Sequence, residues 1–283
     1  MSSVLVTGAS RGIGLAITRH FAERGWEVYA TARTDADLRT LGELPGVHPV
    51  RLDITDREAL AELPRNLPPQ LDAVVNNAGI IVQGPVETVP LDTLSRQLDV
   101  NVTAQVGVVQ AVLPLLRRSR GRIVFMSSVS GLITVPGTGA YSASKYALES
   151  IADALRMELR PWGIRVSLVE PGPTRTDMWG DALDDYDQMV AGLTPEHREL
   201  YARQLDGNRT LVRRTQKLVS DPATVVAAVD RALTSRRPRA RYRCDQVSRA
   251  QVALAAVAPT AATDALFSAL TTTRSARSTL PVP

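Results

Sequence analysis

The sequence has few of the residues that form disulfide frameworks or metal sites. One cysteine, Cys244, among 283 residues excludes an internal disulfide framework and a thiolate metal cage. The three histidines, His20, His48 and His197, are too scattered to match a metal-binding spacing, so we expect no bound metal. A chain of this length with 44% hydrophobic residues can instead bury a full core, as one large domain or two small ones.

Signals for export and for membrane insertion are also missing. The first apolar run starts at Val4, which leaves no room for a signal or transit peptide, so we expect a cytoplasmic location. The longest uncharged helical stretch, 100–116, contains Asn101 and Gln105 among other polar side chains. A buried helix explains it better than a membrane span, and we expect no stable membrane insertion.

Lysine is nearly absent, and the positive charge is concentrated in one arginine-rich region. Basic residues outnumber acidic ones clearly in 196–249, which an anionic partner such as an acyl-carrier protein or coenzyme A would suit. Solvated helix faces in an arginine-rich chain are the favoured explanation. Aromatic residues do not alternate with basic ones there, so we expect no nucleic-acid partner.

Apolar β-branched runs alternate with helical patterns through most of the chain. This alternation predicts an α/β fold with a parallel, doubly wound sheet. Long helices are expected at 91–118 and 140–161, because their apolar residues recur with a helical period. Strands are expected at 4–7, 27–32, 47–54, 72–75, 122–126, 164–169 and 240–244.

The last third of the chain departs from this alternation. Residues 177–219 are polar with scattered aromatics, and we interpret them as a helical substrate lid inserted into a domain that spans 1–250. Residues 251–283 predict a C-terminal helical tail. Its apolar side chains are expected to pack on the body of the protein rather than on a membrane surface: Leu254, Val257, Leu266, Phe267 and Leu270.

Three glycines, Gly8, Gly12 and Gly14, directly follow the first expected strand and open a helix. Glycines let the backbone approach a pyrophosphate, and a helix N-terminus offers unpaired N–H groups to it. The spacing differs from the G-x-G-x-x-G fingerprint, and a bare turn at a helix start is the weaker alternative. The pattern therefore favours a nucleotide site.

The ends of the next strands indicate which nucleotide binds. Arg33 follows the second strand, where an acid would accept the ribose 2′-OH of NAD, and an arginine suits the 2′-phosphate of NADP. Arg11 lies in the glycine turn, so two guanidiniums are available to one phosphate. Asp35 and Asp37 lie just beyond, and a loop that curled back would supply the missing acid. Asp53 ends the third strand, placed to cap an adenine edge.

Tyr141 and Lys145 lie four residues apart on an expected helix, so their side chains share one face. A tyrosine pKa near ~10 is too high for acid–base catalysis at neutral pH. A cation within about 4–6 Å lowers such a pKa by roughly 1–3 units. Ser128, at the end of the fifth strand, is placed to hold a substrate oxygen. The set predicts proton transfer between a carbonyl and an alcohol, although a buried aromatic beside a solvated lysine is the commoner origin of this spacing.

Together, the glycine turn, residues 76–79, Asn101, Ser128, the Tyr141-x-x-x-Lys145 pair and residues 171–176 resemble the short-chain dehydrogenase/reductase family over roughly 3–245. The resemblance implies a Rossmann-type sheet of about seven strands flanked by helices. It implies that Tyr141 is the acid/base, that Lys145 binds the nicotinamide ribose and lowers the tyrosine pKa, and that Ser128 binds the substrate oxygen. Asn101 would hold a water relay behind Lys145.

The same resemblance implies the residues that bind the cofactor, NADP(H), and the surface that forms an oligomer. A homodimer or homotetramer would form through the helices 91–118 and 140–161, with Val106, Val109, Val112 and Leu113 as surplus apolar residues. Asn76 is expected to stabilise the sheet instead. The cofactor residues are Gly8, Ser10, Arg11, Ile13, Gly14, Arg33, Asp53, Ile54, Asn77, Ala78, Gly79, Tyr141, Lys145, Pro171, Gly172, Thr174 and Thr176.

We therefore predict an NADP(H)-dependent oxidoreductase that interconverts a carbonyl and a secondary alcohol on a lipophilic small molecule, similar to the branch acting on steroids and retinoids. A 3-oxoacyl thioester reductase remains an alternative. A catalytically silent NADP(H)-binding regulator is disfavoured because it needs no complete catalytic set, and residues 76–79 disfavour an extended-branch epimerase or dehydratase. The substrate pocket is expected to include Met178, Trp179, Leu183, Met189, Leu193 and Tyr201.

Overall fold

The computed structural model describes residues 1–176 and 180–272. Within these ranges, seven parallel strands form one sheet in the order β3-β2-β1-β4-β5-β6-β7, which confirms the predicted doubly wound fold. The strand order reverses between β1 and β4, the position where such sheets bind ligands. The strands are β1 (Ser3–Val6), β2 (Glu27–Ala32), β3 (Val47–Arg51), β4 (Ala73–Asn76), β5 (Arg122–Met126), β6 (Arg165–Glu170) and β7 (Arg241–Arg243).

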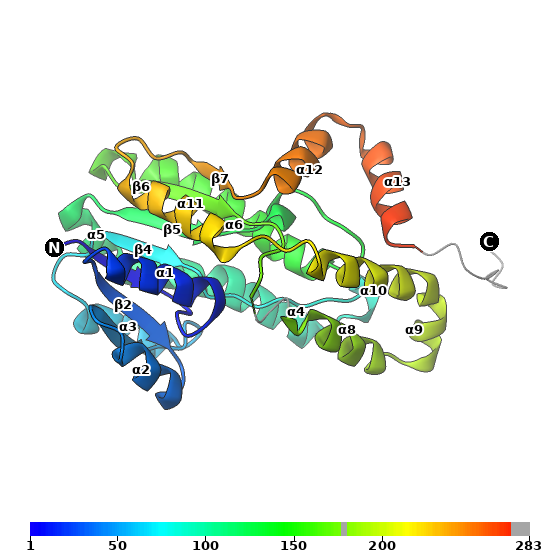
Figure 1. Cartoon of the computed structure of the whole chain (residues 1–283), viewed down its shortest axis with the longest axis horizontal. Helices are drawn as coiled ribbons and strands as arrows, with labels where there is room; N and C mark the ends of the chain where they lie inside the picture. Colours follow the sequence, from blue (N-terminus) through cyan, green and yellow to red (C-terminus); the bar gives the residue numbers. More distant parts are fainter. Residues whose placement is uncertain (177–179, 273–283) are drawn as a thin grey trace.

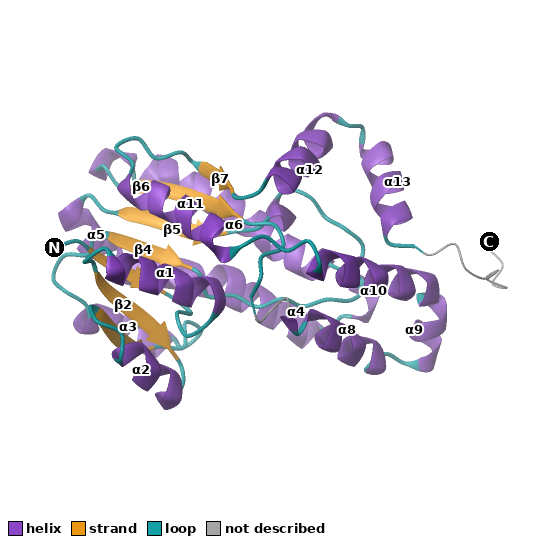
Figure 2. Ribbon diagram, in the orientation of Figure 1, coloured by secondary structure: helices purple, strands orange, loops and turns teal. Residues whose placement is uncertain are grey.

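Helices cover both faces of the sheet (Figures 1 and 2). Alternate residues of β1 point to opposite faces, as the strand period of two requires: Val4 packs in one core and Leu5 in the other. The first core is covered by α1 (Gly12–Glu23), α2 (Asp35–Gly42) and α11 (Pro222–Thr234). The second is covered by α3 (Arg57–Glu62), α5 (Ala104–Ser119) and α6 (Gly139–Glu158). Short 3-10 turns occupy Leu63–Asn66, Val86–Thr88, Val129–Gly131 and Arg160–Trp162.

The long helix expected at 91–118 is present, but it contains a break. It consists of α4 (Leu91–Leu98), a π-helical turn at Asp99–Thr103 and α5. A π turn shifts the register of the helix locally, and such turns occur frequently at functional sites. The turn places Asn101 at its centre, with the side chain fully buried.

The segment Leu91–Ser119 is long and apolar enough to cross a membrane by length and composition. In this fold its apolar character has another cause, because Val109 and Val112 of α5 are buried in the core against the sheet. The prediction that these two valines form a surplus apolar face is therefore wrong. Val106 and Leu113 are only partly buried and stay available for an interface between subunits.

Beyond β6, the chain forms two helical groups to one side of the sheet (Figure 1). The first, at the predicted lid, comprises α8 (Ala182–Ala191), α9 (Pro195–Leu200) and α10 (Ala202–Gln216). The second, the tail, comprises α12 (Gln246–Val257) and α13 (Thr260–Leu270). Most apolar residues expected to pack the tail on the body are exposed instead: Leu254, Val257, Leu266 and Leu270.

The tail contacts the body through other residues. Thr271 is buried against α10, where a Cβ added to Gly207 would lie only 2.3 Å from the Thr271 carbonyl oxygen. Asp245 caps α12 and accepts a hydrogen bond from the backbone N–H of Gly172 (3.2 Å). Val252 of α12 is also buried, so an apolar side chain adds to the small, close contacts that anchor the two ends of the tail.

Candidate active site

A cavity of about 760 Å³ opens at the carboxyl ends of the strands. Every residue predicted from the sequence to bind cofactor or substrate oxygen lines it, and Asn101 lies just behind the wall. We call the side formed by residues 8–14, Arg33, Asp53 and 77–79 the cofactor wall. The opposite side, the substrate wall, consists of 135–138 with Ala182, Tyr186, Asn208, Leu211, Val212 and Thr215.

The glycine turn of the cofactor wall allows no side chain at its third glycine. A Cβ on Gly14 would lie 2.1 Å from the Gly8 carbonyl oxygen and 2.6 Å from Asn77 Nδ2. Gly8 adopts a left-handed conformation (φ +63°), which glycine tolerates without strain. No side chain caps the N-terminus of α1 at Arg11. Open N–H groups at this turn suit a phosphate.

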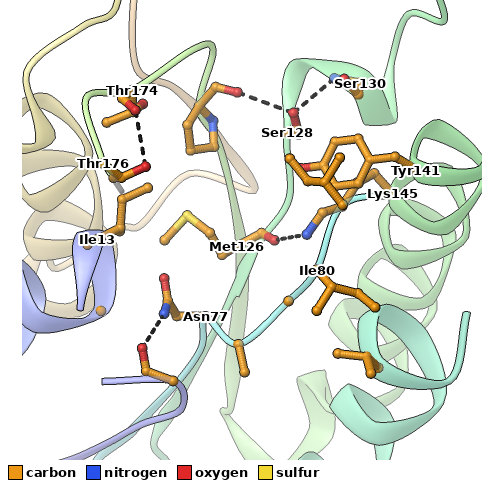
Figure 3. Close-up of a pocket in the computed structure, with 18 of the residues that line it drawn as sticks. Ile13, Asn77, Ile80, Met126, Ser128, Ser130, Tyr141, Lys145, Thr174 and Thr176 are labelled. Atoms are coloured by element: carbon orange, nitrogen blue, oxygen red, sulfur yellow. Dashed lines mark hydrogen bonds between the residues drawn. The ribbon is translucent and has the colours of Figure 1, made fainter. Parts of the chain in front are cut away.

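Thr7 fixes the turn to the end of β4. Its hydroxyl accepts hydrogen bonds from the backbone N–H groups of Asn77 (3.0 Å) and Ala78 (3.1 Å). Asn77 Nδ2 donates in return to the carbonyl oxygens of Thr7 (3.0 Å) and Gly8 (3.1 Å) (Figure 3). Sequence reasoning missed Thr7, although a polar residue directly before the glycine turn is a usable signal.

Two unpaired guanidiniums lie on the cofactor wall. The Arg11 and Arg33 side chains are exposed, line the cavity and have no hydrogen bond or ion pair with the described residues. Arg33 also helps to lower the pKa of Asp53, although the main causes are hydrogen bonds from the N–H and hydroxyl groups of Thr55. This end of the cavity is therefore suited to a phosphate with an adjacent polar edge.

The two acids that might have replaced the missing carboxylate have other partners. Asp35 forms an ion pair with Arg51. Asp37 accepts a hydrogen bond from the Thr34 hydroxyl (2.8 Å), while Thr34 Oγ1 accepts from the Asp37 N–H and caps α2. Asp37 lines the cavity, but its carboxylate is held in the cap of α2.

Ser128, Tyr141 and Lys145 converge on one side of the cavity (Figure 3). Lys145 Nζ lies 5.7 Å from the centre of the Tyr141 ring and donates to the Met126 carbonyl (2.7 Å). Ser128 Oγ accepts the N–H of Ser130 (3.2 Å), which fixes the serine side chain at the end of β5. The spacing of Tyr141 and Lys145 on α6 thus gives the expected side-by-side placement.

Burial dominates the ionisation of this pair. It raises the pKa of Tyr141 to about 12, against a hydrogen bond with Ser128 that lowers it. It also lowers the pKa of Lys145 to about 8, against the charge of Glu149 that raises it. In the chain by itself, burial therefore keeps the tyrosine pKa above its usual value, and the expectation that Lys145 lowers this pKa in the working enzyme stays a prediction.

Hydrogen bonds hold the Asn101 side chain in place. Asn101 Oδ1 accepts the Ile80 N–H (2.9 Å), and Nδ2 donates to the Ile80 carbonyl (2.9 Å) and to Ser144 Oγ (3.0 Å). A Cβ added to Gly79 would lie 3.2 Å from Asn101 Oδ1 and 3.9 Å from Lys145 Nζ. Gly79 therefore lies close to both Asn101 Oδ1 and Lys145 Nζ, where a side chain would crowd the asparagine oxygen. The neighbouring Asn76 is buried, and its carboxamide makes no hydrogen bond with the described residues.

The substrate wall differs from the prediction. Leu183, Met189, Leu193 and Tyr201 do not line the cavity, and the Tyr201 hydroxyl instead donates to Glu87 (2.5 Å). Met178 and Trp179 lie outside the described residues. The lid helices turn other faces toward the cavity, because contacts with segments remote in sequence set the rotation of each helix. The residues of these helices that line the cavity are Ala182, Tyr186, Asn208, Leu211, Val212 and Thr215.

A family model described as short chain dehydrogenase matches residues 2–187. The chain belongs to this family. An NADPH-dependent 3-dehydrocapnine reductase from Ornithobacterium rhinotracheale is 35% identical, with 86% of this chain and 87% of the relative covered. Retinol dehydrogenase 5 of Mus musculus is 33% identical over 84% of this chain and 79% of its own. The crystal structure of a short-chain dehydrogenase from Streptomyces avermitilis superposes with a TM-score of 0.74, covering 95% of this chain and 94% of that one at 28% identity.

Proposed function

We propose that this short-chain dehydrogenase is an NADP(H)-dependent enzyme that interconverts a ketone and a secondary alcohol on a lipophilic substrate. The observation that carries the proposal is that Ser128, Tyr141 and Lys145 line the same cavity as the glycine turn and two unpaired arginines. The similarity to a reductase named as NADPH-dependent supports the choice of cofactor. The apolar residues of the substrate wall support a lipophilic substrate.

The chain offers a complete set of groups for NADP(H). The turn at Gly8 and Gly14 would hold the pyrophosphate, Arg11 and Arg33 the 2′-phosphate, and Lys145 the nicotinamide ribose. The fit rests on the close packing of Gly14 against the Gly8 carbonyl, which sets the shape of the turn, and on the uncapped α1 N-terminus. When bound, NADPH supplies the hydride for carbonyl reduction.

Ser128 and Tyr141 act on the substrate oxygen. The Ser128 hydroxyl donates a hydrogen bond that stabilises negative charge developing there. With its pKa raised to about 12, Tyr141 keeps its proton at neutral pH and is suited to donate it to an alkoxide, which is a stronger base than phenolate. In the reduction direction, Tyr141 is therefore the proton donor in this proposal.

Lys145 and Asn101 resupply the proton in this proposal. Gly79 lies close to both Asn101 Oδ1 and Lys145 Nζ, so a water molecule bound beside its backbone would have polar partners in both groups. A water held there would connect the Lys145 ammonium to Asn101 and then to bulk solvent. The π turn fits this role because it carries Asn101 out of the regular register of the helix.

A 3-oxoacyl thioester on an anionic carrier is the second candidate, because the basic region 196–249 would suit such a partner. Three arginines of this region are paired within the fold: Arg209 with Asp187, Arg241 with Glu149, and Arg243 with Glu170. Their charges are less available to a carrier, which weighs against this candidate. The complete catalytic set argues against a silent regulator. We also propose a cytoplasmic homodimer or homotetramer formed through α4, α5 and α6, with residues 177–219 as the substrate lid.

The test is a substrate panel of hydrophobic ketones, secondary alcohols, 3-oxoacyl thioesters and small sugars, each followed by the absorbance of NADPH and of NADH. We expect NADPH oxidation with a hydrophobic ketone. Turnover confined to acyl thioesters would select the second candidate. Tight NADPH binding with no turnover of any member would favour the silent regulator.

A further inference from the structure

A cluster of buried charges lies directly behind the catalytic residues. Glu149 of α6 is 5% exposed and Glu170, the last residue of β6, is 1% exposed. Neither lines the cavity, so neither contacts substrate or cofactor. Buried carboxylates are expensive for a fold, and such groups are often retained for function.

Arg241 of β7 joins these acids to each other. Its Nε donates to Glu149 Oε2 (2.9 Å) and lies 3.3 Å from Glu170 Oε1, and its Nη2 donates to Asp153 (2.8 Å). Arg243 pairs with the other oxygen of Glu170 at 3.2 Å. The Arg241 guanidinium therefore contacts three acids, and its Nε–H···Oε2 bond holds the Glu149 carboxylate in place.

Glu149 is connected to the catalytic residues by helix geometry. Tyr141, Lys145 and Glu149 follow each other at intervals of four on α6, so they share one face, and both Lys145 and Glu149 are buried. A Cβ added to Gly131 would lie 3.1 Å from Glu149 Cγ and 3.2 Å from the Lys145 carbonyl oxygen. The loop after β5 therefore packs tightly against this part of the helix.

A second connection runs through the end of β5. In the sequence, Ser127 lies between Met126 and Ser128. The Met126 carbonyl accepts a hydrogen bond from the Lys145 ammonium. The buried Ser127 hydroxyl has no hydrogen-bond partner at bonding distance among the described residues, but it is near enough to Glu149 to lower the pKa of that carboxyl against the larger raising effect of burial. Glu149 thus touches both sequence segments that hold the reacting groups.

Among the described residues, Glu149 is the charged group that acts on the Lys145 ammonium, although the two groups do not form a direct ion pair. The other groups that face the ammonium are neutral: the Tyr141 phenol on α6, the Met126 carbonyl on β5 and the Asn101 amide on the π turn. Glu149 itself faces Arg241, Asp153 and Glu170. Its negative charge opposes the effect of burial, which lowers the pKa of Lys145 to about 8.

We propose that Glu149 is a positioning residue for the reaction: held by Arg241, its carboxylate acts through Lys145, one helical turn earlier, and keeps that side chain charged behind Tyr141. The proposal rests on the proposed function for its catalytic meaning. The coupling between the charges of Glu149 and Lys145 is measurable without any substrate, so its test does not depend on the proposed function.

Two lysines in the whole chain, Lys145 and Lys217, make this coupling directly measurable. Protein made with lysine isotopically labelled at Cε gives two NMR signals, and Lys217→Arg assigns them. We expect Glu149→Gln to move the titration midpoint of Lys145 down by about one pH unit, since it removes a nearby opposite charge. Asp153→Asn is the matched control: Asp153 lies on the same helix and also pairs with Arg241, so the variant removes an equal charge. It should leave the Lys145 midpoint close to the wild-type value.

An unchanged Lys145 midpoint in folded Glu149→Gln would overturn the proposal. If that variant does not fold, Glu149→Asp withdraws the carboxylate by one methylene and should give a smaller shift in the same direction; no shift there would also overturn it. With a ketone that wild type reduces, the high-pH limb of kcat should move to lower pH in Glu149→Gln. A uniform loss of kcat with an unmoved limb would indicate a merely structural role and would contradict the proposal.

Discussion

The cofactor wall and the substrate wall bound the same cavity but are built differently. The cofactor wall consists of residues at strand ends, such as Gly8 and Asn77, whose places follow from the sheet itself. The substrate wall depends on contacts between remote segments: Gly207 of α10 packs on Thr271, and a Cβ on Gly137 would lie 2.7 Å from Asn208 Nδ2. The residues that carry the family's motifs thus lie at a sheet edge, whereas under the proposed function the choice of substrate would depend on how α10 and the C-terminal helices pack.

The strongest prediction for the cofactor wall concerns Gly14. Gly14→Ala places a methyl group 2.1 Å from the Gly8 carbonyl oxygen, so the turn must move. Losing two charge-assisted hydrogen bonds to phosphate, at about 1.5–3 kcal/mol each, should weaken NADPH binding by about a hundredfold or more. Fluorescence titration with NADPH measures this. Gly180→Ala is the control, because a Cβ there meets nothing within 4 Å. If Gly14→Ala bound NADPH with wild-type affinity, the cofactor wall would not be rigid and this prediction would be contradicted.

The second prediction concerns the proposed preference for NADP(H) over NAD(H), in which Arg33 binds the 2′-phosphate. Arg33→Asp replaces an unpaired guanidinium by a carboxylate that repels a 2′-phosphate, and the loss of about 1.5 kcal/mol or more should weaken NADPH binding at least tenfold. NADH binding should change much less. Arg39→Asp, on the exposed side of α2, makes the same charge change away from the cavity. Competitive titration decides between the cofactors, and an equal loss for both would argue against a 2′-phosphate site.

The two walls also differ in how much of each was predictable from the sequence. The glycine turn and the Tyr141–Lys145 pair were predictable because each rests on spacing within one strand–turn–helix unit. The lining residues of α8 and α10 were not, because the rotation of each helix depends on partners such as Thr271. Nor was the cluster of Glu149, Glu170 and Arg241, whose members meet only in the folded sheet.

The substrate wall should respond separately to a change at its support. Gly207→Ala introduces a methyl group 2.3 Å from the Thr271 carbonyl oxygen and forces lid and tail apart. Overpacking of this kind costs about 1–3 kcal/mol, so we expect the KM for a ketone to rise about fivefold or more. NADPH affinity should stay near wild type. In the control Gly192→Ala, the added methyl group makes only ordinary contacts, 3.4 Å from the nearest atom. An equal loss of NADPH affinity in Gly207→Ala would show that the two walls are not independent.

The smallest effect is on the pH dependence of stability. Burial, then the charge of Glu149, raises the pKa of Glu170 from 4.5 to about 7, while Arg243 and Arg241 oppose this. Between these values the folded chain holds a proton that the unfolded chain has lost, so stability falls as pH rises through this window. Glu170→Gln should remove about 1–3 kcal/mol of this pH-dependent change in the free energy of unfolding. Denaturant unfolding of both proteins at the two ends of the window measures it, and identical slopes would contradict the assignment.

The most direct test of the account is a side-by-side measurement of NADPH binding and ketone reduction in wild type and Tyr141→Phe. The substitution removes the transferable proton and almost no volume. General acid catalysis contributes about 10²–10⁴-fold, so kcat should fall by that factor while the NADPH dissociation constant stays within about twofold. Near-wild-type kcat in Tyr141→Phe, with NADPH bound normally, would contradict the central claim that this tyrosine protonates the substrate oxygen.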